Sequence, residues 1–305
     1  MRNAMATTFR KDWQMEFSTQ TETLVTMFPA EEAIDILLDA GYPCLDMSLF
    51  GSGEALVDGD WKGCAAELRK RVEDRGARFN QAHAPFGGGC EYYTGTTVPR
   101  LPRFFDFAAA LGAEDIVVHP LQDGPYHGNE KALFERNVEF YRALAPAAKD
   151  AGLKIAIENM WQCHKRVPGL IVDDVCAPPD EHAALLDALD DPMAFTICLD
   201  IGHAAICGFE PDESIRTIGG TRLGALHVHD VNYRQDNHTL PGIHNIDWDA
   251  VCRALGEVGY KGVFTLEADN FLKGFGAEFA RPAARFMAER AKFLADKVDS
   301  YRAAK

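Results

Sequence analysis

Several features that often reveal a protein's function are missing from this sequence of 305 residues. No GxGxxG motif follows any strand-like segment, so the usual fingerprint of a nucleotide-binding sheet is absent. The eight cysteines are scattered and none forms a CxxC pair, which argues against a disulfide framework or a structural zinc knuckle and favours reduced thiols in a cytoplasmic protein. No long linker, low-complexity tract or charge block divides the chain. We therefore expect one domain over residues 1–305.

Positive charge is also scarce. The chain has 31 Lys and Arg against 46 Asp and Glu, which gives a formal net charge of −15. An acidic surface repels phosphate backbones, so we expect no nucleic acid partner, whereas a small polar substrate and a homo-oligomer are compatible with the sequence. The first residues, MRNAMATTFRKDWQ, contain no apolar signal-peptide segment, and no later stretch is long and uncharged enough to cross a bilayer. We therefore expect a soluble protein.

Strand-like and helix-like segments alternate along the whole chain. Short apolar runs are followed by stretches with apolar residues at helical spacing, and no hairpin signal is evident. Eight such pairs occur, with strands expected at 13–19, 43–50, 78–84, 115–120, 154–159, 195–200, 224–229 and 263–268. Eight strand and helix pairs in a chain of this length predict a closed (β/α)8 TIM barrel, with a doubly wound open sheet as the alternative.

Four residues of types that bind divalent metals stand at the ends of four successive apolar runs in the second half of the chain. They are Glu158, Asp200, His229 and Glu267. The carboxyl ends of barrel strands converge at one mouth, where barrel enzymes keep their active sites. We therefore predict that these four hold a divalent metal, and their mixed oxygen and nitrogen donors suit Mn, Zn, Fe or Co. His227 points to the same side as His229, but we prefer His229 because it lies nearer the strand end.

Further candidate ligands occur at strand ends and in the loops that follow them. The candidates for additional metal or substrate binding are His83, His119, His203, Asp236 and His238. Substrate contacts are also expected for Trp161, which could form an apolar wall, and for Arg234, which is a cation near the mouth. Ordinary loop packing and solvated charge are the alternatives for these two residues. The other histidines are expected to be solvated, with contact to substrate as the alternative for His164 and His244: His127, His164, His182 and His244.

The motifs HAPFGGG, VVHP, IENM, LDIGHA, LHVHD, DNHTLPGIHNIDW and GYKGVFTLEAD together resemble the xylose-isomerase-like TIM barrel superfamily. The resemblance runs from about residue 30 to 295. This superfamily includes sugar phosphate isomerases and epimerases, ketose 3-epimerases, inosose dehydratases and abasic-site endonucleases. By resemblance, Glu158 and Glu267 are an acid/base pair as well as metal ligands with Asp200 and His229, and His203 contacts substrate.

Two branches of this superfamily differ in what they imply. The segment HDVNYRQDNH lacks the Gly-Glu stretch and the Asn-Arg pair of the ketose epimerases. The Asp236 and His238 pair, with His83 and His119, instead resembles the ligand set of the trizinc endonucleases, although the gap of 7 residues from His229 to Asp236 (236 minus 229) is short for that group. DNA-intercalating loops are not recognisable.

The prediction from the sequence is a metal-dependent isomerase, epimerase or dehydratase. Its substrate would be a sugar, a sugar phosphate or a polyol-derived ketone, and the reaction would proceed through proton abstraction and a metal-stabilised enediolate. A multi-zinc phosphodiesterase acting at abasic sites is the alternative enzyme. A sugar-binding barrel without catalytic activity is a third interpretation.

Overall fold

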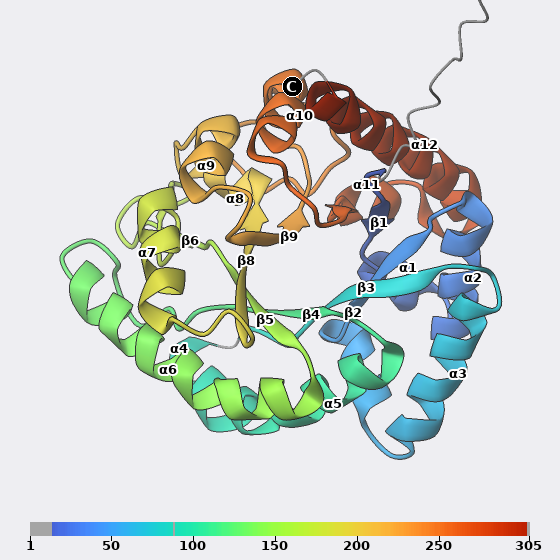
Figure 1. The fold of residues 1–305 in the computed structure, drawn as a ribbon, viewed down its shortest axis with the longest axis horizontal. Helices are drawn as coiled ribbons and strands as arrows, with labels where there is room; N and C mark the ends of the chain where they lie inside the picture. The colour runs from blue at the N-terminus through green and yellow to red at the C-terminus, as the bar shows by residue number, and fades with distance from the viewer. Residues whose placement is uncertain (1–13, 88, 304–305) are drawn as a thin grey trace, which may run out of the picture.

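The computed structural model describes residues 14–87 and 89–303, which form a parallel barrel surrounded by helices (Figure 1). All eight predicted strands are present: β1 (Phe17–Thr19), β2 (Cys44–Ser48), β3 (Arg78–His83), β4 (Asp115–Val118), β5 (Lys154–Glu158), β8 (Phe195–Asp200), β9 (Leu223–His227) and β10 (Phe264–Leu266). Six of them form one parallel sheet in the order β2, β3, β4, β5, β8, β9, and β1 pairs with β10. Single bridges, Gln20 with Asp46 and Val228 with Leu266, join the two sets. The predicted TIM barrel fold is therefore confirmed.

Helices cover the outside of the barrel. They are α1 (Glu22–Met27), α2 (Ala30–Ala40), α3 (Trp61–Glu73), α4 (Gly89–Tyr92), α5 (Leu101–Leu111), α6 (Glu130–Ala151), α7 (Pro179–Leu189), α8 (Ile201–Ile206), α9 (Pro211–Ile218), α10 (Trp248–Val258), α11 (Asp269–Lys273) and α12 (Gly276–Ala303). Short 3₁₀ or π segments lie at Gly51–Val57, Tyr93–Thr97 and Val98–Arg100. Among the described helices, none is long and apolar enough to span a membrane.

The ends of these helices follow from local sequence. The Asp247 side chain accepts hydrogen bonds from the first turn of α10, which satisfies backbone N–H groups that have no partner within the helix. Helix α6 ends at Gly152, whose φ of 75° lies in the left-handed region that glycine adopts without strain. Between these ends, the apolar residues of the longer helices are buried in the large core.

The interior of the barrel is filled by small side chains from neighbouring strands. Val117, Ala156, Cys198 and Ala225 form a buried cluster of their own, separate from the large core between sheet and helices. Layers of inward-pointing side chains of this kind fill a barrel rather than leaving a pore. A functional site is therefore expected at the mouth of the barrel.

Two local features differ from the sequence predictions. A short antiparallel pair, β6 (Trp161–Cys163) with β7 (Ile171–Asp173), follows β5, although no hairpin was expected. Its turn contains Gly169 with φ 75°, and the Pro-Gly dipeptide there is the turn signal that could have predicted it. His182 was expected in solvent but is fully buried, because α7 packs on β8 and the Nε2–H of His182 donates to the Ile157 carbonyl at 2.9 Å.

Candidate metal centre

Four buried side chains from four strands face a common point at the carboxyl end of the barrel. They are Glu158, Asp200, His227 and Glu267, whose candidate ligand atoms all lie within 4.8 Å of one another. His227 Nδ1 lies 3.0 Å from Glu267 Oε2, 3.3 Å from Glu158 Oε1 and 3.9 Å from Asp200 Oδ2. We call these four residues the inner set. Three carboxylates and one imidazole can chelate a divalent transition metal.

His227 occupies the place in the inner set where the sequence analysis put His229. Strand β9 ends at His227, whose Cα is paired with that of Asp200 at the end of β8. His229 faces the same side but lies two residues farther toward the mouth, and it does not join Glu158 and Glu267 in one ligand group. The structure thus groups His227 rather than His229 with Glu158 and Glu267, because β9 ends at His227, earlier than its apolar run suggested.

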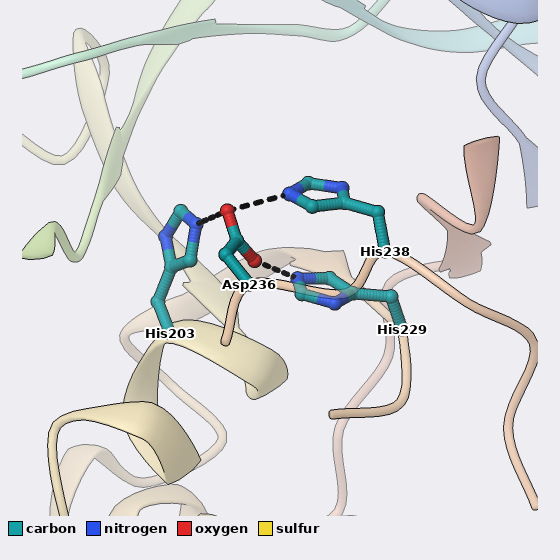
Figure 2. A group of neighbouring side chains, drawn as sticks. All are labelled: His203, His229, Asp236 and His238. Carbon is teal, nitrogen blue, oxygen red and sulfur yellow. Dashed lines mark hydrogen bonds and ion pairs between the residues drawn. The ribbon is translucent and has the colours of Figure 1, made fainter. Parts of the chain in front are cut away.

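His229 belongs to a second group, the outer set, which Figure 2 shows. Its members are His203, His229, Asp236 and His238. Asp236 lies among the three rings: its Oδ2 is 2.9 Å from His238 Nε2 and 3.5 Å from His203 Nε2, and its Oδ1 is 3.8 Å from His229 Nε2. The rings of His229 and His238 are stacked with centroids 4.0 Å apart. Three imidazoles and one carboxylate resemble the ligand sets of tetrahedral zinc sites.

The two remaining candidate histidines lie against Glu158. The Nε2 atoms of His83 and His119 are 3.3 and 3.0 Å from Glu158 Oε2. Glu158 therefore faces the inner set with Oε1 and these two histidines with Oε2. The structure brings all five additional candidates from the sequence analysis to the mouth of the barrel.

Three of these histidines form a hydrogen bond through Nδ1, which leaves Nε2 facing the carboxylate of Glu158 or Asp236. The Nδ1–H groups of His83, His203 and His238 donate to backbone carbonyls at 2.8, 2.9 and 3.1 Å. In a neutral ring, this arrangement keeps the proton on Nδ1 and leaves Nε2 free to bind a metal, and it is common among metal-binding histidines.

Buried ligand atoms point to the same conclusion. Among the described residues, Glu158 Oε2, Glu267 Oε2, Asp236 Oδ1 and both ring nitrogens of His227 make no hydrogen bond of regular geometry, although imidazole nitrogens lie within 3.3 Å of the two glutamate oxygens. Buried polar atoms without partners are costly, and a cation would satisfy them. The residues of the site therefore fit a bound divalent ion.

The charges around the centre hold its acids ionised. Burial favours the neutral form of Glu158, but the imidazoles of His119 and His227 keep the pKa of Glu158 well below its usual range. Burial also opposes a charge on His238, yet Glu267 and Asp236 raise the pKa of His238 to about 10. A metal ion bound by these groups would displace protons, so its affinity would fall as the pH is lowered.

Residues outside the ligand sets hold the ligands in place, and the sequence analysis missed them. Asn159 accepts from the Asp200 backbone N–H at 2.7 Å and donates to the Asp200 carbonyl at 3.0 Å. The Gln20 side chain donates to Glu267 Oε1 at 2.6 Å. Such outer partners orient ligands and tune metal affinity. Their sequence signal is weak, since it consists of one polar residue at the end of an apolar run.

A cavity of about 280 Å³ opens above the centre. Glu158, Glu267 and His203 contribute polar walls, and Phe86, Met160 and Trp161 contribute apolar ones. Trp161 thus lines the cavity, as the sequence analysis expected. Arg234 is exposed and does not line it, so the expected contact of Arg234 with substrate has no support in the described structure. No Lys or Arg is among the described residues that border this cavity.

Buried carboxylates and imidazoles at the carboxyl-end mouth of a parallel barrel define the class: a (β/α)8 barrel protein with a candidate divalent-metal centre. Residues 34–295 match the family described as the xylose isomerase-like TIM barrel, and the chain belongs to this family.

Individual similar proteins span most of the chain. The uncharacterised protein MJ1311 of Methanocaldococcus jannaschii is 29% identical over 212 residues, which cover 67% of this chain and 68% of MJ1311. A crystal structure of a D-tagatose 3-epimerase-like protein superposes with a TM-score of 0.72 at 22% identity, covering 93% of this chain and 100% of that one. The structure of IolI protein with a bound zinc atom gives a TM-score of 0.70 at 18% identity, covering 94% and 99%. At these identities, the two structures show a shared fold.

Proposed function

We propose that this protein is a divalent-metal-dependent isomerase or epimerase acting on a sugar or a polyol-derived ketone. The observation that carries the proposal is the placement of Glu158 and Glu267. These carboxylates come from β5 and β10, both contact His227, and both border the same cavity. Two carboxylates on different strands can reach both faces of one substrate carbon. The epimerase-like structural neighbour and the zinc-containing IolI support this assignment.

The chemistry follows from the groups around the cavity. A divalent ion held by the inner set would act as a Lewis acid on a carbonyl oxygen and its neighbouring hydroxyl. One glutamate removes the proton on the adjacent carbon, and the other returns a proton to the opposite face or assists the departure of hydroxide. His203, which borders the cavity, contacts a substrate hydroxyl. Phe86, Met160 and Trp161 keep bulk water from the reacting carbons.

Solvent proton exchange tests this mechanism. A panel of ketoses and inososes is incubated with the metal-loaded protein in heavy water, and we expect deuterium at the carbon next to the carbonyl of the product. Glu158→Gln and Glu267→Gln should each suppress incorporation on the order of 10²-fold or more. Metal content is measured in each variant, because loss of the ion would mimic loss of the base. The matched control is Glu278→Gln, at an exposed position in α12. Turnover without solvent deuterium would refute the two-glutamate mechanism.

Hydrolysis of phosphate esters by a multinuclear centre is the second candidate function. It is favoured by the ligands beyond the inner set, namely His83 and His119 on Glu158 and the outer set around Asp236. Several adjacent ions can hold an attacking water and neutralise a phosphoryl group.

Cleavage of abasic duplex DNA at physiological salt distinguishes the two functions. We expect no binding and no cleavage, because the net charge of −15 opposes phosphate approach. Tight, salt-sensitive binding with strand cleavage and three metal equivalents per chain would establish the second function instead of the first.

A further inference from the structure

A second cavity, which we call the side chamber, lies next to the one above the metal centre. Its volume is about 230 Å³, and it shares Phe86, His238 and Glu267 with the main cavity. Its other walls are Glu22, Phe50, Asp269, Asn270 and Lys273. If the reacting carbons of a substrate lie between Glu158 and Glu267, its remaining carbon atoms can therefore extend into the side chamber.

Hydrogen bonds join the polar wall of the side chamber to the loop that carries Asp236 and His238. The Asn270 backbone N–H donates to the His238 carbonyl at 2.9 Å, and the Asn270 side chain donates to the Asn237 carbonyl at 2.9 Å. On the other side, the Thr23 hydroxyl donates to the Asp269 carbonyl at 3.1 Å. Helix α11 is thereby held between the outer set and α1. These hydrogen bonds hold the walls of the side chamber in a defined position relative to Glu267.

The charges in the side chamber do not suit an anionic group. Lys273 is the one lysine or arginine among the described residues that border it, and its Nζ lies 3.4 Å from Glu22 Oε2. Asp269 and Glu267 add two more carboxyl groups. Recognition of a phosphate normally uses Arg or Lys charges that are not already neutralised, and the main cavity offers none. The tail of the substrate that enters here therefore carries no phosphate or other negative charge.

The remaining walls suit a chain of carbons that carry hydroxyl groups. Phe50 and Phe86 pack together with ring centroids 4.8 Å apart, and Phe86 continues into the main cavity. These rings present apolar surface to carbon-bound hydrogens of a substrate. The Lys273 ammonium can donate a hydrogen bond to a substrate hydroxyl group, and the Glu22 carboxylate can accept one.

We infer that the side chamber is the subsite for the tail of an unphosphorylated polyhydroxy substrate, with Lys273 and Glu22 as its hydrogen-bonding pair. The inference rests on the proposed function, because that function places the reacting carbons between the two glutamates. The substrates are then free ketoses or related polyols that are long enough to reach beyond Phe86.

Direct binding tests the subsite without relying on turnover. Dissociation constants are measured on the full-length, metal-loaded protein by ligand-observed NMR. The probes are the four D-ketohexoses, the four-carbon ketose erythrulose and D-fructose 6-phosphate. We expect at least one ketohexose to bind more tightly than erythrulose and more tightly than the phosphate ester. Lys273→Met and Glu22→Gln should each weaken that ketohexose about tenfold and leave erythrulose within about twofold. Lys131→Met, at an exposed position in α6, is the matched control and should change nothing.

Three results would overturn the subsite: tighter binding of the phosphate ester, equal effects of the two variants on erythrulose and ketohexose, or no binding of any ketohexose. Failure of the proposed function is a separate outcome. A ketohexose that binds with the expected dependence on Lys273 and Glu22, but exchanges no proton with solvent, would support the subsite and refute the isomerase mechanism.

Discussion

The ring of His229 occupies the space that a side chain at position 202 would need. A Cβ atom on Gly202 would lie 2.0 Å from Cε1 of His229. Because position 202 is a glycine, the ring fits against the start of α8, and its Nε2 lies 3.1 Å from both carboxylate oxygens of Asp200. The glycine in the DIGHA segment thus has a steric role in the metal centre: it allows a member of the outer set to contact a member of the inner set.

Replacing this glycine should disturb metal binding by displacing His229, although no candidate ligand residue is itself substituted. In Gly202→Ala, the added methyl group forces the His229 ring away from Asp200 and Asp236. We expect metal affinity to fall about 10- to 100-fold, the range typical of lost outer partners. Titration with a competing chelator measures the affinity. Gly95→Ala is the control, since a Cβ there meets nothing within 4 Å. Unchanged affinity in Gly202→Ala would mean that the His229 contact is dispensable.

The two histidines of the LHVHD segment should differ in what they hold. His227→Ala should empty the inner set, because His227 is its one nitrogen donor. His229→Ala should leave the ion of the inner set in place and weaken binding at the outer set. Elemental analysis after dialysis counts the ions, and the visible spectrum of the cobalt-loaded protein reports the donors. Loss of the inner-set ion in His229→Ala but not in His227→Ala would restore the original prediction that His229 is the ligand.

Buried His182 should make stability depend on pH. Burial lowers the pKa of His182 to about 4, against about 6.5 in an unfolded chain. As the pH falls from about 6.5 to about 4, the unfolded state takes up the proton before the folded state does, so the free energy of unfolding decreases. The contribution is on the order of 3 kcal/mol.

Urea denaturation at a series of pH values tests this contribution. His182→Gln retains an amide donor that can reach the Ile157 carbonyl but cannot titrate. Its free energy of unfolding should therefore decline less between pH 6.5 and pH 4 than that of the wild type. Parallel declines would show that His182 does not carry the effect.

The fold could be predicted from the sequence because each strand is a short apolar run with a polar residue at its end. That pattern also placed Glu158, Asp200 and Glu267 at the mouth, since parallel strands end on the same side. The choice between His227 and His229 could not be made in this way, because strand alternation puts both on one side and the register of β9 on β8 decides which is deeper. The contact between Lys273 and Glu22 in the side chamber could not be predicted from the sequence, because the two residues are 251 positions apart (273 minus 22).

The pairing of the strands determines how strongly the barrel is closed by backbone hydrogen bonds. Strands β1 and β10 form a pair that is joined to the six-stranded sheet by one bridge on each side, so the barrel has two weak seams. Glu267 directly follows β10, and Glu158 ends β5 in the larger sheet. An ion bound by both glutamates would link the β1–β10 pair to the six-stranded sheet at the mouth of the barrel, where few backbone hydrogen bonds join them. Stripping the metal should then speed amide hydrogen exchange in β1 and β10 before it loosens β4 or β5.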